Sequence, residues 1–70
     1  MSERRLANRL KELRGLRGLT QSELALLAGV SRKTVNTVEN CVFVPSTLLA
    51  LTLARCLHAR VEDLFYIEDA

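Results

Sequence analysis

The chain has 70 residues, a length at which one small domain folds around a modest core. Its formal net charge is only +2, and 49% of its residues are hydrophobic, which suits a globular protein. There is no apolar run long enough to span a membrane and no signal peptide, so we expect a cytoplasmic protein without a membrane partner. Two cysteines and one histidine are too few for a disulfide or zinc framework, and we expect no metal or cofactor.

Charge is distributed unevenly along the chain. Six of the ten cations lie within the first 17 residues, and four of the eight acids lie within the last nine. This separation fits a basic face that meets a polyanion and an acidic face remote from it, and it fits an ordinary solvated surface equally well. The six cations are Arg4, Arg5, Arg9, Lys11, Arg14 and Arg17, and the four acids are Glu62, Asp63, Glu68 and Asp69.

The pattern of apolar residues predicts five short helices and therefore an all-α fold. In the first helix, Leu6, Leu10 and Leu13 are spaced four and three residues apart and form one helical stripe. The second begins at "TQSE", where Thr20 is the expected N-cap and Glu23 completes a capping box.

The third predicted helix follows the second after a very short break. Gly29 is expected to take the left-handed conformation that ends the second helix, and Ser31 is expected to cap a third helix over residues 31–40. Two helices joined by so sharp a bend must cross at close range, which predicts a helix-turn-helix motif over residues 20–40 rather than a plain helical hairpin. The small and apolar residues placed at the crossing are Ala25, Val30, Val35 and Val38.

The fourth helix is predicted to run from the N-cap Ser46 to Leu57, after the loop "CVFVPS". His58 follows where a C-terminal glycine is usual, so we expect a positive φ there. A short fifth helix, "VEDLF", has acids in its first turn, where the helix dipole favours them. The tail "FYIE" is a candidate short strand that pairs with residues near Arg5 to Asn8.

These motifs together resemble the lambda-repressor-like, or Cro/Xre, family of prokaryotic DNA-binding regulators. The resemblance runs from Asn8 to Phe65 through "NRLKELR", "GLTQSELALLAGVSRKTVNTVEN", "PSTLLALTLARCL" and "VEDLF". It implies a compact five-helix domain, here expected over residues 1–70, whose third helix enters the major groove of double-stranded DNA. It also implies that the start of the second helix meets the DNA phosphates.

The sequence departs from the family pattern in three places. Cys41 and Val42 replace the usual glycine and basic residue after the third helix, which is expected to weaken contacts with the DNA backbone there. His58 replaces a common glycine, and Arg60 stands where a capping Ser or Thr is usual. Redox sensing by Cys41 is a further interpretation that the sequence leaves open.

One side of the third helix is polar and carries no acid. At about 100° per residue, its two valines lie on one side, and its basic side chains, its amide side chains and a threonine lie on the other. Phosphate oxygens and base edges accept hydrogen bonds from such side chains, whereas an acid would be repelled. We therefore expect a DNA-binding surface that includes Arg32, Lys33, Asn36, Thr37 and Asn40. The family resemblance adds Gln21, and Ser31 is included at the start of the helix, where it acts chiefly as the N-cap.

The family resemblance implies a role for several of these residues. Arg32, Lys33 and Thr37 match base-reading positions, where Arg32 or Lys33 donates to guanine and Thr37 meets a thymine methyl. Gln21 matches a position that contacts phosphate and braces the recognition helix. The residues expected at the DNA backbone are Asn36 and Asn40.

Glu39 lies at the inward edge of the third helix and needs a partner, because an unpaired and partly buried carboxylate is unfavourable. The resemblance points to Arg14 in the first helix, whose guanidinium suits a bidentate pair. We expect this pair to be structural and not catalytic.

Two other classes of function compete with transcriptional regulation by a small repressor-type protein. The chain has one histidine, no Gly-rich phosphate loop and no HExxH or GxSxG motif, which argues against an enzyme with catalytic residues. A protein-interaction module, such as an antitoxin with the same fold, is the other alternative, and it overlaps with DNA binding.

The chain carries more apolar residues than a 70-residue monomer buries. Leu48 and Leu51 lie on the side of the fourth helix opposite its buried stripe, and a leftover patch of this kind is typical of an interface. Alternatively, the tail covers both leucines within one chain. We expect a two-fold homodimer, which places two recognition helices about 34 Å apart at successive major grooves. The expected interface, remote from Arg32 and Lys33, consists of Phe43, Leu48, Leu51, Tyr66 and Ile67.

Overall fold

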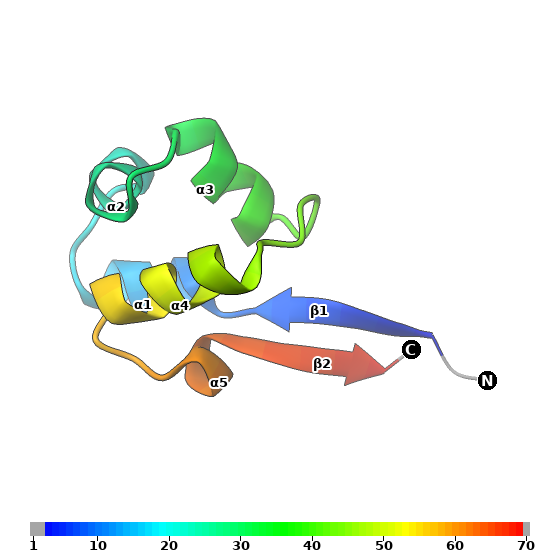
Figure 1. Cartoon of the computed structure of the whole chain (residues 1–70). Helices are drawn as coiled ribbons and strands as arrows, with labels where there is room; N and C mark the ends of the chain where they lie inside the picture. Colours follow the sequence, from blue (N-terminus) through cyan, green and yellow to red (C-terminus); the bar gives the residue numbers. More distant parts are fainter. Residues whose placement is uncertain (1–2, 70) are drawn as a thin grey trace.

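The computed structural model describes residues 3–69, which form five helices and one two-stranded antiparallel sheet (Figure 1). The prediction of five helices is confirmed. Helices α2 and α3 lie on one side of the helical body, and the sheet extends from the other. No helix among these residues is long and apolar enough to cross a membrane. The elements are β1 (Arg4–Asn8), α1 (Leu10–Leu16), α2 (Gln21–Ala28), α3 (Arg32–Glu39), α4 (Thr47–Cys56), α5 (Val61–Leu64) and β2 (Phe65–Asp69).

The core is built from leucine, valine and alanine, with Phe65 as its one buried aromatic side chain among the described residues. Every helix contributes at least one buried residue, so the five short helices depend on one another for stability. No polar or charged residue among residues 3–69 is buried as a whole, although the side chain of Glu39 is almost completely buried. The core consists of Leu10, Leu24, Ala25, Val35, Val38, Leu53, Ala54, Leu57, Leu64 and Phe65.

Leu6 lies in a strand, so the prediction that it belongs to the first helix is wrong. Strand β1 pairs with β2 in antiparallel register, with Leu6 opposite Ile67. The predicted pairing of the tail with residues near Arg5 to Asn8 is confirmed. The spacing of Leu6 from Leu10 fits a helical stripe, but the tail supplies hydrogen-bond partners that favour an extended backbone instead.

The sheet brings the two charged ends of the chain together. The Nε of Arg5 donates to Oε1 of Glu68 at 2.7 Å, and this hydrogen bond raises the pKa of Arg5. Across the same ladder, Arg4 Nε lies 3.6 Å from Oδ1 of Asp69. Of the two interpretations of the uneven charge, the one with separate basic and acidic faces is therefore wrong for these four residues, because their charges pair.

Four helices end in the same left-handed turn. The residue that closes each of these turns has a positive φ: 67° at Gly18, 74° at Gly29, 59° at Cys41 and 54° at His58. It is the first residue after α2 and the second residue after α1, α3 and α4. In each case, this residue and the next donate their N–H groups to carbonyls of the last helical turn, which is the Schellman arrangement. The positive φ predicted for His58 is confirmed, and so is the left-handed conformation of Gly29.

We expect His58→Gly to raise the free energy of unfolding by about 0.5–1 kcal/mol. A residue with a side chain costs about 1–2 kcal/mol in the left-handed region, and the greater freedom of glycine in the unfolded chain offsets part of this gain. Urea denaturation followed by circular dichroism measures the change. His58→Ala is the control, because it removes the imidazole and keeps the Cβ. An equal gain in both variants would show that φ is not the cause.

Candidate nucleic-acid interface

The turn between α2 and α3 is built from two N-caps and one glycine. Thr20 Oγ1 accepts from the N–H of Glu23 at 3.0 Å, and the Glu23 carboxylate accepts from the N–H of Thr20 at 2.8 Å, so the predicted capping box is confirmed. The hydrogen bond from the Thr20 backbone lowers the pKa of Glu23. After Gly29 reverses the chain, Ser31 Oγ accepts from the N–H of Thr34 at 3.1 Å and starts α3.

Helix α3 has a fixed orientation because its apolar side is locked against α2 and the core. Val35 and Val38 are almost completely buried, and so is Ala25 on α2. The N–H of Val30 donates to the Ala25 carbonyl at 3.0 Å, which holds the two helices together at the turn. The opposite side of α3 therefore faces away from the protein.

A network around the Glu39 carboxylate joins the first three helices. Arg14 Nε donates to Glu39 Oε2 at 2.7 Å and Arg14 Nη2 to Oε1 at 3.2 Å, so Arg14 is the bidentate partner expected for Glu39. The Glu39 side chain is only 3% exposed and that of Arg14 14%. Hydrogen bonding to Glu39 raises the pKa of Arg14. Gln21 Nε2 also donates to Glu39 Oε1, at 3.0 Å, so Gln21 on α2 braces α3.

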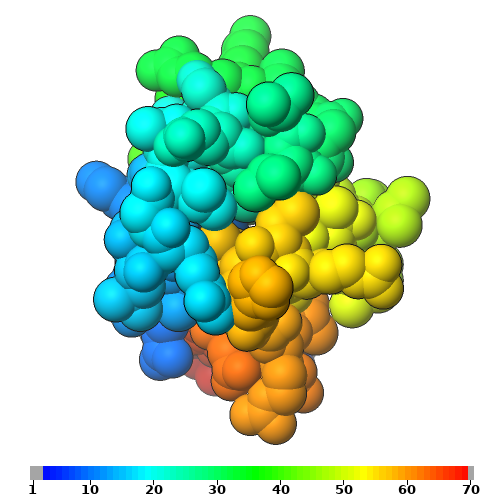
Figure 2. Space-filling view, turned by 90° about the vertical axis from the view of Figure 1, so that its left-hand side faces the viewer, coloured from blue at the N-terminus to red at the C-terminus, as the bar shows by residue number. Residues whose placement is uncertain are grey.

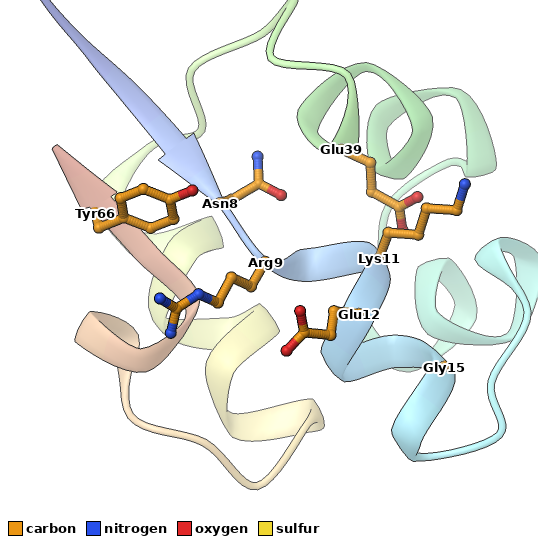
Figure 3. Close-up of a pocket in the computed structure, with 7 residues that line it drawn as sticks. All are labelled: Asn8, Arg9, Lys11, Glu12, Gly15, Glu39 and Tyr66. Atoms are coloured by element: carbon orange, nitrogen blue, oxygen red, sulfur yellow. The ribbon is translucent and has the colours of Figure 1, made fainter. Parts of the chain in front are cut away.

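Asn8 fixes the far end of α3, a role that the sequence analysis missed. Its Nδ2 donates to the Val38 carbonyl at 2.9 Å, and its Oδ1 accepts from the N–H of Leu10 at 3.0 Å. Figure 3 shows Asn8 where β1 meets α1. An asparagine just before a helix is a capping signal, and it would point to the contact with Leu10. The predicted first helix includes Asn8, because its stripe begins at Leu6, so this signal was hidden, and no local signal points to the contact with α3.

The structure places the predicted DNA-binding residues of α3 along its outward side. Arg32 and Lys33 are exposed, and neither forms an ion pair within residues 3–69. The amides are connected to one another: Asn40 Nδ2 donates to Asn36 Oδ1 at 2.7 Å, and Gln21 Nε2 lies 3.5 Å from the same oxygen. The outward side thus carries two unpaired cations next to a row of amides, an arrangement suited to a polyanion.

Phe43 lies beside this outward side, so the expectation that it is remote from Lys33 is wrong. The two residues line one hollow, together with Thr37. The physical reason is the left-handed turn at Cys41, which folds the loop back so that the N–H of Phe43 donates to the Thr37 carbonyl at 3.2 Å.

The other residues predicted for the dimer interface lie on two separate elements. Leu48 and Leu51 line a hollow on α4, and both are exposed, so the alternative in which the tail covers them is wrong. Tyr66 and Ile67 lie on β2. The Tyr66 ring is 5.3 Å from the guanidinium carbon of Arg9, at the depression drawn in Figure 3.

Comparisons with known proteins agree with this arrangement. The sequence profile of the helix-turn-helix family matches residues 10–64. The uncharacterized HTH-type transcriptional regulator YgzD of Bacillus subtilis is 39% identical over 64 residues, which are 91% of this chain and 97% of YgzD. The uncharacterized HTH-type transcriptional regulator MJ0272 of Methanocaldococcus jannaschii is 41% identical over 64 residues, with the same two coverages. The crystal structure of the restriction-modification controller protein C.AhdI from Aeromonas hydrophila superimposes with a TM-score of 0.75 at 38% identity, over 79% of this chain and 83% of that one.

Proposed function

Because the chain belongs to the Cro/Xre-type helix-turn-helix family of transcriptional regulators, we propose that it is a homodimeric repressor that binds specific sequences of double-stranded DNA. Members of this family are DNA-binding regulators and not enzymes. The acid-free outward side of α3 supports the proposal most directly, because Val35 and Val38 hold this side away from the core. We place the activity in the cytoplasm.

In the proposed complex, α3 lies in the major groove and its two cations reach base edges. Arg32 or Lys33 donates to O6 and N7 of a guanine, the commonest specific contact of such side chains. Gln21, at the start of α2, contacts a phosphate, and its side-chain amide is positioned by its hydrogen bond to Glu39. The remaining contacts to the DNA backbone come from Asn36 and Asn40, while Ser31 serves α3 chiefly as its N-cap.

We expect Arg32→Ala to weaken operator binding by about 1–3 kcal/mol and to relax specificity at one base pair. The substitution removes a bidentate donor without disturbing the fold, because Arg32 is exposed and has no ion pair within residues 3–69. Fluorescence anisotropy on the operator and on its single-base variants measures both effects. Equal losses on every sequence would assign Arg32 to a phosphate instead of a base.

The proposed dimer contact is the exposed side of α4. Leu48 and Leu51 line a hollow of about 220 Å³ together with Thr52 and Arg55. Two exposed leucines one turn apart suit a self-complementary apolar contact around a two-fold axis. In Figure 2, the loop before α4 and the start of α4, coloured yellow-green to yellow, stand out at the right edge and are accessible to a partner.

Selection of bound sequences from a pool of random duplexes tests the proposed function. A homodimer should enrich two-fold symmetric sites whose half-sites are about 10–10.5 base pairs apart, centre to centre. Affinity for the selected site should also fall steeply as the salt concentration rises, because bound phosphates release counterions. Absence of any enrichment and of any affinity for duplex DNA at low salt would contradict the proposal and favour a role in protein binding.

A further inference from the structure

A hollow of about 330 Å³ lies directly beside the outward side of α3. It is continuous with the proposed DNA-binding surface, because Lys33 and Thr37 belong to both. Its opposite wall comes from the loop after α3 and consists of the apolar side chains of Val42 and Phe43. The hollow is lined by Lys33, Thr34, Thr37, Val42 and Phe43.

The hydroxyl groups of both threonines are already engaged within the protein. Thr37 Oγ1 donates to the Thr34 carbonyl at 3.0 Å, and Thr34 Oγ1 shares a hydrogen bond with Ser31 Oγ at 3.0 Å. What the threonines offer to a partner is therefore chiefly their methyl groups. Together with Val42 and Phe43, they make the hollow apolar, and Lys33 adds the only charge among its lining residues.

The apolar wall is held in place before any partner binds. The N–H of Val42 and the N–H of Phe43 both donate to the Thr37 carbonyl, at 2.9 and 3.2 Å. The N–H of Cys41 donates to the Val38 carbonyl at 3.1 Å. The loop is thus tied to the last turn of α3. Binding of a ligand in the hollow therefore costs little conformational entropy, because the loop is already ordered.

We infer that this hollow receives the methyl-bearing edge of one thymine in each operator half-site, so that Val42 and Phe43 determine specificity. The inference rests on the proposed function. Among the groups that bases present in the major groove, the thymine 5-methyl is the apolar one. Cytosine would bring its amino group into an apolar site without a partner, which is unfavourable. The cationic Lys33 favours a polyanion over a second copy of this apolar loop.

Replacement of operator thymines by uracil, one position at a time, tests the inference because it removes only the methyl group. We expect one position per half-site at which uracil weakens binding about fourfold, the effect of losing one buried methyl group. Phe43→Ala should bring this ratio close to one while the protein still binds DNA. Val44→Ala is the matched control: Val44 is a 68% exposed apolar residue of the same loop outside the hollow, so this variant should keep the fourfold ratio.

Several results would overturn the inference. Binding to the operator with no position sensitive to uracil would do so and would leave the proposed function intact. A Phe43→Ala variant that sediments as a monomer and keeps the fourfold ratio would assign the hollow to a second copy of the chain. Failure of the unaltered protein to bind any duplex would instead reject the proposed function itself.

Discussion

Arg14→Ala is expected to lower the free energy of unfolding by about 3–5 kcal/mol, because it leaves the Glu39 carboxylate buried without its charge partner. The Glu39 side chain is 3% exposed, and after the substitution Gln21 is the only residue in the range 3–69 that still donates to it. Domains are stable by only about 5–15 kcal/mol, and a 70-residue domain lies toward the lower end. Thermal and urea denaturation should therefore find a large unfolded fraction at 37 °C.

Two further variants show whether the cost in stability comes from the buried, unpaired charge of Glu39 or from the loss of an ion pair as such. Arg4→Ala breaks the exposed pair with Asp69, in which both side chains are more than 60% exposed, and should cost less than about 1 kcal/mol. Arg14→Met combined with Glu39→Met removes both charges and should recover much of the stability lost in Arg14→Ala. A cost for Arg14→Ala no greater than that for Arg4→Ala would contradict this structural role.

Leu51→Glu is expected to convert the protein to a monomer and to weaken operator binding by about 100-fold or more. The dimer binds its second half-site as an intramolecular step, and this advantage is lost when the subunits separate. Leu51 is 51% exposed on α4, so a glutamate there should not disturb the fold of one chain. Analytical ultracentrifugation gives the mass, and anisotropy titration gives the affinity.

Leu16→Glu is the matched control for this experiment. Leu16 is also an exposed leucine on a helix, but it lies at the end of α1 and not in the hollow on α4. It introduces the same charge and should leave both mass and affinity unchanged. A Leu51→Glu variant that keeps its oligomeric mass and full operator affinity would show that α4 is not the dimer interface.

The features that could be predicted from the sequence are those whose chemistry is local. Thr20, Glu23, Gly29 and Ser31 lie within one helix and the turns that flank it, and each makes its capping contact within a few residues. The residues on the outward side of α3 could be predicted from the helical period, because Val35 and Val38 define the inner side.

The features that could not be predicted depend on distant partners or on the path of a loop. Leu6 fits a helical stripe, and only the pairing of its segment with residues some 60 positions away makes it a strand residue. Phe43 was recognised as an excess apolar residue, but its direction depends on the positive φ of Cys41. Asn8 bonds to the Val38 carbonyl, 30 residues away, and no spacing rule predicts such a contact.

The central claim is that the outward side of α3 binds duplex DNA, and chemical-shift mapping of the ¹⁵N-labelled protein tests it most directly. Titration with the selected operator at low salt should shift or broaden amide signals of residues 31–43 and of Gln21, whereas those of α5 and the sheet should change little. The claim would be contradicted by changes confined to other elements with α3 unaffected, or by no change at all at saturating DNA.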